Sequence, residues 1–156
     1  MTKSMPGLSF PDVNVWMALL LSEHIHHPIA KSWWKSEEFD SICFTRVTQI
    51  SVLRLLTTSA VMNNNPLTMK KAWKVYDRLF TDDRVSYMPE NTDVDRYFRQ
   101  YTSEGVPCPK VWADAWLLAM AESHDGTIIT FDARLASRGD SAGKGRCVLL
   151  ASAMAQ

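Results

Sequence analysis

Three aspartates stand at places where the sequence pattern changes from one structural element to the next. Asp12 follows the short apolar stretch 8–10, and Asp132 follows the apolar stretch 127–131. Asp114 lies in the first turns of an otherwise apolar helical segment. Carboxylates packed together raise one another's pKa, so a cluster that stays ionised at neutral pH needs a cation. Mg²⁺ is the expected ion, because it prefers oxygen ligands and often binds a few carboxylates together with substrate phosphate oxygens. The three residues therefore suggest phosphodiester hydrolysis.

Helix capping is the alternative interpretation of two of these residues. Aspartate is a favoured N-cap, and Asp12 and Asp132 each precede a plausible helix. Capping therefore explains either residue taken alone. Asp114 is harder to explain in this way, because a buried carboxylate within a helix needs a partner. A shared position of all three at one edge of a sheet would favour the metal site.

The aspartates can meet only if strands and helices alternate along the chain. Short apolar runs predict strands at 8–10, 41–44, 84–88, 127–131 and 147–150. Helical spacing predicts helices at 13–21, 29–35, 47–56, 68–80, 93–101 and 111–123, and a turn or short helix beginning at Asp132. Strands separated by helices predict an α/β fold with a mostly parallel sheet. Ligands bind such sheets at the carboxyl ends of the strands, where Asp12 and Asp132 are expected.

Composition limits the class of protein. The chain has 156 residues, of which 46% are hydrophobic and 22% charged, which suits one compact domain. Lys and Arg number 17 and Asp and Glu number 17, so there is no polycationic tail and any polyanion must be bound locally. The three cysteines fit neither a CxxC motif nor a disulfide framework, which predicts a reducing, cytoplasmic environment. Neither a signal peptide nor a membrane span is expected.

Several short segments together resemble the PIN-domain ribonucleases, with the closest likeness to VapC toxins. They are residues 11–19, the pair His26 and His27 followed by Ala30 and Trp33, and residues 48–57, 114–117 and 130–132. These segments occur in the family's order between about residues 10 and 135, while residues 63–109 match only loosely. The resemblance implies a PIN-like three-layer α/β/α sandwich with a mostly parallel central sheet. It also implies a single PIN domain over residues 1–156.

The resemblance assigns a catalytic site residue by residue. It makes Asp12, Asp114 and Asp132 the acidic metal-binding residues. Gln49 stands where many relatives have a glutamate, so it is expected in the catalytic site without contributing a charge. Its carbonyl oxygen could coordinate the metal or hydrogen-bond a metal-bound water, and the missing charge favours one bound ion over two.

Three more residues have implied supporting roles. Asn14 and Thr130 would orient Asp12 and Asp132 through hydrogen bonds, although local turn bonding explains them equally well. Arg54 belongs to the family-like Leu-Arg-Leu segment. It is implied to bind RNA or the antitoxin, or to pair with an acid of the site.

The implied activity is metal-assisted hydrolysis of RNA, with Mg²⁺ or, as a substitute, Mn²⁺. By the same resemblance, the protein is the toxin of a type II toxin–antitoxin pair, forms a homodimer and is held inactive by a cognate VapB-like antitoxin. A function from another class stays open, because Gln49 replaces an acid. In that alternative the chain is a PIN-like module that has lost catalysis and only binds RNA or a protein partner.

Two clusters of polar residues favour structural explanations. A basic helix face could contact RNA phosphates, but a solvated amphipathic face explains it better. Its members are Lys70, Lys71, Lys74 and Arg78. The histidines at 24, 26 and 27 lack a second ligand pair at zinc spacing, so capping and packing of a loop are favoured over a zinc site.

Overall fold

The computed structural model describes residues 7–141 and 146–151. The other residues of the single domain that is expected over 1–156 lie outside the described ranges. The strands are β1 (Leu8–Pro11), β2 (Ser41–Phe44), β3 (Val85–Tyr87), β4 (Thr127–Thr130) and β5 (Cys147–Leu149). They form one sheet in the order β3-β2-β1-β4-β5, in which every neighbouring pair is parallel. The predicted parallel α/β fold is confirmed.

The helices follow the strands much as the apolar spacing predicts. They are α1 (Val13–Leu20), α2 (His27–Lys35), α3 (Arg46–Leu56), α4 (Met69–Leu79), α5 (Val94–Tyr101), α6 (Trp112–Ser123) and α7 (Ala133–Ser141). The turn or short helix expected at Asp132 is the nine-residue helix α7. None of the described helices combines the length and apolar character that crossing a bilayer requires.

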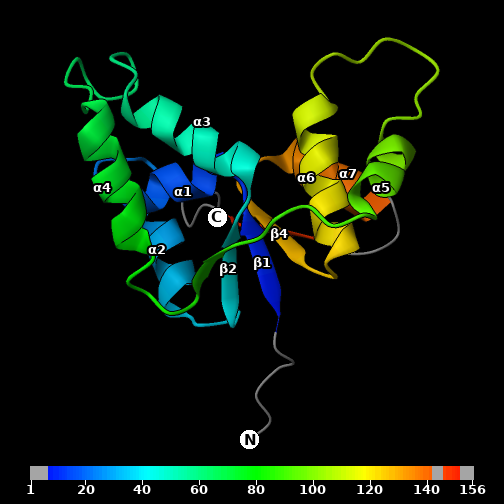
Figure 1. Ribbon diagram of the computed structural model, residues 1–156, viewed down its shortest axis with the longest axis horizontal. Helices are drawn as coiled ribbons and strands as arrows, with labels where there is room; N and C mark the ends of the chain where they lie inside the picture. Colours follow the sequence, from blue (N-terminus) through cyan, green and yellow to red (C-terminus); the bar gives the residue numbers. More distant parts are fainter. Residues whose placement is uncertain (1–6, 142–145, 152–156) are drawn as a thin grey trace, which may run out of the picture.

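The helices cover both faces of the sheet (Figure 1). One buried cluster joins the sheet to α1, α2, α3 and α4, and a second joins it to α5, α6 and α7. Helices on both faces are what a parallel sheet requires, because its strands are apolar on both sides. The architecture is therefore the three-layer α/β/α sandwich that the resemblance implies.

An aromatic stack holds the first layer of helices on the sheet. Trp16 of α1 and Phe44 of β2 are fully buried, and their rings stack with centroids 3.9 Å apart and planes 13° apart. Tyr76 of α4 meets the Phe44 ring edge-on at 4.8 Å. Aromatic rings contribute large apolar areas to a core in these geometries. The stack therefore fixes α1 and α4 relative to β2.

The start of α3 is set by a reciprocal cap at the end of β2. The Thr45 hydroxyl accepts a hydrogen bond from the Thr48 backbone N–H at 3.2 Å, and the Thr48 hydroxyl accepts one from the Thr45 backbone N–H at 2.9 Å. Such a capping box satisfies two N–H groups that a helix start leaves without partners. It places the first turn of α3 at the carboxyl end of the sheet.

Gly126, just before β4, is expected to tolerate no side chain. A Cβ there would lie 2.5 Å from Cε2 of Phe10 and 3.1 Å from the Leu8 carbonyl oxygen. Phe10 is fully buried and cannot move aside. Gly126→Ala should therefore lower the free energy of unfolding by about 1–3 kcal/mol, the usual cost of overpacking. Urea unfolding would measure this loss, and Gly105→Ala is the matched control, because no atom lies within 4 Å of its added Cβ.

Candidate active site at the carboxyl edge of the sheet

Two of the predicted acids lie side by side because their strands are neighbours. β1 and β4 pair in parallel with Pro11 opposite Ile129, and the Asp12 N–H donates to the Ile129 carbonyl at 2.8 Å. Asp132 comes two residues after the end of β4. The strand register thus brings Asp12 and Asp132 to the same edge of the sheet.

Thr130 joins these two acids. Its hydroxyl donates a hydrogen bond to Oδ2 of Asp12 at 3.2 Å and accepts one from the Asp132 backbone N–H at 2.9 Å. The Thr130 side chain is fully buried, so its position is fixed by the surrounding core. One hydroxyl group therefore orients the Asp12 carboxylate and the chain segment that carries Asp132.

Both acids also cap helices, as the alternative interpretation expects. Oδ1 of Asp12 accepts from the Val13 N–H at 2.8 Å, and Oδ1 of Asp132 accepts from the Arg134 N–H at 2.8 Å. Capping and clustering are therefore not exclusive here. Each cap holds one carboxylate oxygen against its own helix start.

The third acid approaches from α6. Asp114 lies in the first turn of this helix and is half-buried. Burial raises the pKa of Asp114, and the charges of Asp12 and Asp132 raise it further, while Arg138 and Arg134 lower it. The pKa of Asp12 is also raised, mainly by burial and in part by the charge of Asp132. The three carboxylates therefore lie within electrostatic reach of one another, which favours binding of a cation.

The donor set suits a hard divalent cation, but the carboxylates do not form a closed cage. Three carboxylates offer only oxygen ligands, as Mg²⁺ prefers. Among the side chains that the structure describes, however, no three of His, Cys, Asp or Glu are close enough together to hold an ion as they stand. Binding would therefore have to draw the acids of this edge together against their mutual repulsion.

Gln49 is held by residues of its own layer. Its Oε1 accepts a hydrogen bond from Nη1 of Arg46 at 2.6 Å, and its side chain lies close enough to Tyr76 to lower the pKa of that residue against the raising effect of burial. Gln49 is buried, at 8% exposure. Its carbonyl oxygen is therefore already engaged by a guanidinium, at the position where the resemblance expects a contact with the metal or its water.

The other predicted residues lie on the surface of the first helical layer. Asn14 is exposed on α1 and lines a pocket of about 650 Å³ together with Met17 and Leu55. Arg54 is exposed on α3 and lines an apolar pocket of about 370 Å³ with Trp73. Of the two residues expected to orient the acids, only Thr130 makes its contact through a hydrogen bond to an acid of the site.

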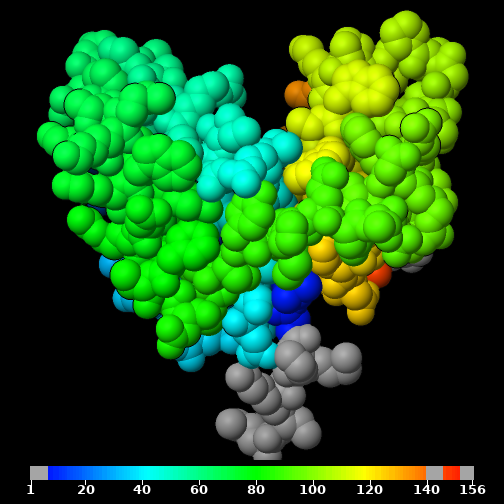
Figure 2. Space-filling model, in the orientation of Figure 1, coloured from blue at the N-terminus to red at the C-terminus, as the bar shows by residue number. Residues whose placement is uncertain are grey.

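The acidic edge opens into a groove in the surface. Figure 2 shows the molecule hollowed between the part that carries α3 and the part that carries α6. The helices α3 and α6 both have their N-termini on this side of the sheet (Figure 1). The groove therefore lies on the side of the sheet at which β1 and β4 end.

Two arginines near the acids were not singled out from the sequence. Arg134 and Arg138 belong to α7 and lower the pKa of Asp114. Arg138 also donates to Glu104 and to the Tyr101 carbonyl. The only sequence signal for them is their place in the helix that begins after Asp132.

The fold and the acidic edge define a parallel α/β domain with carboxylates at the ends of adjacent strands. The profile of the PIN domain family matches residues 9–140 of this chain. Ribonuclease VapC41 of Mycobacterium tuberculosis is 36% identical over 126 residues, which cover 78% of this chain and 86% of that protein. Ribonuclease VapC29 of the same species is 30% identical over 125 residues, or 80% and 86% of the two chains. The chain belongs to the PIN domain family and, within it, to the VapC type.

Solved structures show the same fold at low sequence identity. The crystal structure of Mycobacterium tuberculosis VapC20, described as a sarcin-ricin loop cleaving toxin, matches with a TM-score of 0.62 and 14% identity over 84% of this chain and 95% of that chain. FitAcB from Neisseria gonorrhoeae matches with a TM-score of 0.58 and 18% identity over 85% and 93%. These matches support the three-layer fold.

Proposed function

We propose that the protein is a metal-dependent endoribonuclease and the toxin of a VapBC-type toxin–antitoxin pair. The observation that supports this proposal is the position of Asp12 and Asp132 at the ends of adjacent strands of a PIN fold, with Asp114 of α6 within electrostatic reach of both. Relatives that are named ribonucleases and are 30–36% identical to this chain over 125–126 residues support the same activity.

The residues at this edge would have different roles in the reaction. Asp12, Asp132 and Asp114 would hold Mg²⁺ or Mn²⁺, which when bound supplies an acidified water and offsets charge on the phosphate. Thr130 keeps Oδ2 of Asp12 oriented, because its hydroxyl hydrogen points at that oxygen. Each cap uses Oδ1 of its acid, so Oδ2 would be the oxygen that each of the two strand-end acids offers to the cation.

The test is cleavage of total and structured RNA by purified, antitoxin-free protein in Mg²⁺, Mn²⁺ or EDTA. Asp114→Asn, prepared in the same way, separates this activity from contaminating nucleases. We expect cleavage that requires metal and is lost in the variant. Cleavage that persists in EDTA, or in Asp114→Asn, would contradict the proposal.

The proposed partner is an antitoxin that docks on this chain, which we expect to act as a homodimer. Ile50 and Trp73 are 55% and 46% exposed, and both line the apolar pocket between α3 and α4. Because the surroundings of Arg54 are apolar, they suit a protein segment better than an RNA phosphate. We therefore assign Arg54 to antitoxin binding. Analytical ultracentrifugation of the free chain tests the dimer.

A non-catalytic PIN-like binding module is the second candidate, and Gln49 is the observation that favours it. An amide held by Arg46 adds no negative charge to a metal site. Metal titration separates the two functions. A catalytic site binds Mg²⁺ or Mn²⁺ in a way that Asp12→Asn abolishes, whereas a binding module is unaffected by the metal.

A further inference from the structure

A polar and aromatic pocket lies at the same edge of the sheet, beyond the acids. It has a volume of about 300 Å³, which is at the lower end of ligand sites and suits one flat ring system. Its lining comes from the start of α3, the end of α4 and the end of β3. The lining residues are Arg46, Gln49, Tyr76, Asp77, Phe80 and Tyr87.

The geometry points to a nucleobase subsite in this pocket, with Gln49 and Tyr76 as its specificity-determining residues. This inference rests on the proposed ribonuclease function, because the base would belong to the RNA that crosses the groove. It gives Gln49 a role in place of the metal contact that the resemblance implies.

The walls of the pocket have the composition that single-stranded RNA requires. Proteins hold unstacked bases between aromatic rings or guanidinium planes and read their edges with hydrogen bonds. The Arg46 guanidinium lies 5.0 Å from the centre of the Tyr87 ring, and the Phe80 ring lies 5.0 Å from that of Tyr76. A flat, electron-rich base can therefore stack against the aromatic and cationic surfaces that these four side chains present.

The polar groups of the pocket are buried and held in place, as recognition of a base through hydrogen bonds requires. Gln49 and Tyr76 are 8% and 5% exposed, and both line the pocket. The Gln49 carbonyl is held by Arg46, so the orientation of the amide is set and its NH₂ group keeps a defined direction. Asp77 at the exposed rim adds an acceptor and repels phosphate, which favours a base over a phosphate group in the pocket.

The place of the pocket suits a nucleotide close to the scissile bond. β3 pairs with β2 and β2 pairs with β1, so the ends of β3 and β1 are two strand spacings apart, or roughly 10 Å. Tyr87 ends β3, and Asp12 follows β1 at the same carboxyl edge. A nucleotide flanking the phosphate at the acids can therefore reach the pocket.

The first experiment measures binding without catalysis. The four nucleoside 5′-monophosphates are titrated into the protein in EDTA, and the side-chain NH₂ signal of Gln49 is followed by NMR. We expect one base to shift this signal more strongly than the others. Tyr87→Leu should weaken that binding about tenfold or more, which is typical of the loss of a stacking contact. Tyr97→Leu is the matched control, because Tyr97 also carries an arginine over its ring, at 4.6 Å, but lies on α5 in the other layer.

A more conservative variant lowers the risk of misfolding and tests whether the pocket distinguishes one base from another. Tyr76→Phe keeps the ring packed against Phe44 and removes only the hydroxyl group, on a side chain that lines the pocket together with Gln49. It should change the order of preference among the four bases. With an RNA substrate, Tyr87→Leu should raise KM and leave kcat unchanged.

The outcomes separate this inference from the proposed function. Base-selective binding in EDTA that Tyr87→Leu weakens supports the subsite even if no RNA is cleaved. Metal-dependent cleavage with the same KM in Tyr87→Leu overturns the subsite and leaves the nuclease intact. A shift of the Gln49 signal by a tyrosine-containing peptide and by none of the nucleotides would overturn it in favour of a protein ligand.

Discussion

Replacing Asp12 by asparagine should lower RNA cleavage at least about a hundredfold, because a metal ion supplies several kcal/mol of transition-state stabilisation and Asp12 is its central proposed ligand. The change is nearly isosteric. Asparagine is as good an N-cap as aspartate, so the bond from the Val13 N–H at 2.8 Å is preserved. The loss of cleavage would therefore reflect the missing charge. Single-turnover cleavage at saturating Mg²⁺ measures it.

The same substitution should make the metal-free protein more stable. The pKa of Asp12 is raised above its usual value of 3.8 by burial and by Asp132, so the folded state binds a proton more tightly than the unfolded state does. The Asp12 carboxyl group makes its full contribution to the free energy of unfolding below pH 3.8, and this contribution is lost as the pH rises through the raised pKa. In EDTA, the free energy of unfolding of Asp12→Asn should therefore exceed that of the wild type by an amount that grows above pH 3.8. The difference should level off once Asp12 is ionised. Urea unfolding across pH measures it.

Thr130→Val provides the graded comparison. Valine removes the hydroxyl group that bonds Oδ2 of Asp12 and leaves all three carboxylates in place. Cleavage should fall by roughly 10- to 100-fold, as is typical when a group that orients a metal ligand is lost. A Thr130→Val protein as inactive as Asp12→Asn would indicate that the fold at the edge had changed. An Asp12→Asn protein that cleaves normally would remove Asp12 from the site.

The sequence could predict the acidic edge because its position depends on local pattern. Asp12 and Asp132 each end an apolar run, and parallel strands place such residues at one edge whatever the details of packing. Asp114 could be placed by its first-turn position in a long apolar helix. The local pattern does not specify which strands are neighbours, and the register of Pro11 with Ile129 shows that β1 and β4 are.

The surroundings of Gln49 could not be predicted in this way. Its contacts come from Tyr76 on α4 and from the pocket at the end of β3, both in the segment 63–109 that matches the family only loosely. Which side of α3 a buried amide faces depends on how α4 packs against it, and apolar spacing does not contain that information. The bounds of α7 could not be predicted either. Its apolar content is low, and its contacts with β4 and β5 are tertiary, so apolar spacing along the sequence does not define them.

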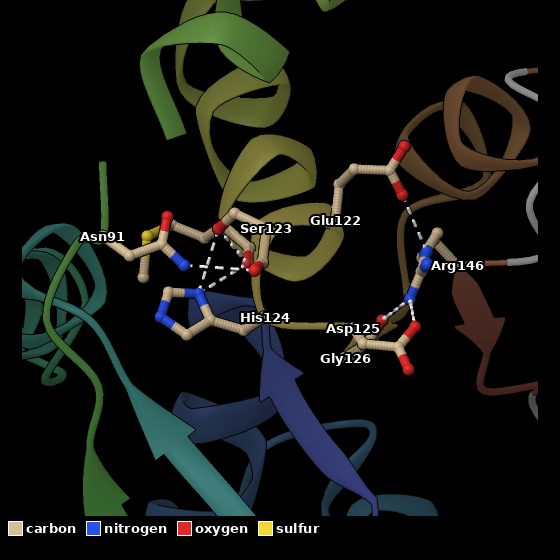
Figure 3. A network of polar contacts seen from close by, with 8 residues as sticks. Asn91, Glu122, Ser123, His124, Asp125, Gly126 and Arg146 are labelled. Atoms are coloured by element: carbon tan, nitrogen blue, oxygen red, sulfur yellow. Dashed lines mark hydrogen bonds and ion pairs between the residues drawn. The ribbon is translucent and has the colours of Figure 1, made fainter. Parts of the chain in front are cut away.

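An ion-pair network joins β5 to the end of α6 at the opposite edge of the sheet. Arg146 precedes β5, and its side chain donates to Glu122 at 3.0 Å, to Asp125 at 2.8 Å and to the Gly126 carbonyl at 3.1 Å (Figure 3). The Glu122 side chain is only 5% exposed, whereas Asp125 is 90% exposed. The guanidinium therefore connects β5 to the end of α6 and to the turn that leads into β4.

Arg146→Leu should lower the free energy of unfolding by about 3 kcal/mol, because removing one partner of a buried ion pair leaves the other charge in the interior. The double variant Arg146→Leu, Glu122→Leu should recover most of this loss, since an apolar pair of similar volume is often neutral. Arg99→Leu is the matched control. Its bond to Asp95 is 2.7 Å long, but both side chains are more than 70% exposed, so less than about 1 kcal/mol should be lost.

The network and the acids lie at opposite ends of the same strands, so stability and catalysis should separate. Arg146 contacts the amino end of β4, while Asp132 follows its carboxyl end. Well below its unfolding temperature, Arg146→Leu should therefore cleave RNA at the wild-type rate, whereas Asp12→Asn should cleave at least about a hundredfold more slowly although it is more stable without metal. Equal losses of stability in Arg146→Leu and Arg99→Leu would show that burial of Glu122 does not strengthen the pair. A slow but fully folded Arg146→Leu protein would show that the strand transmits a change from one edge to the other.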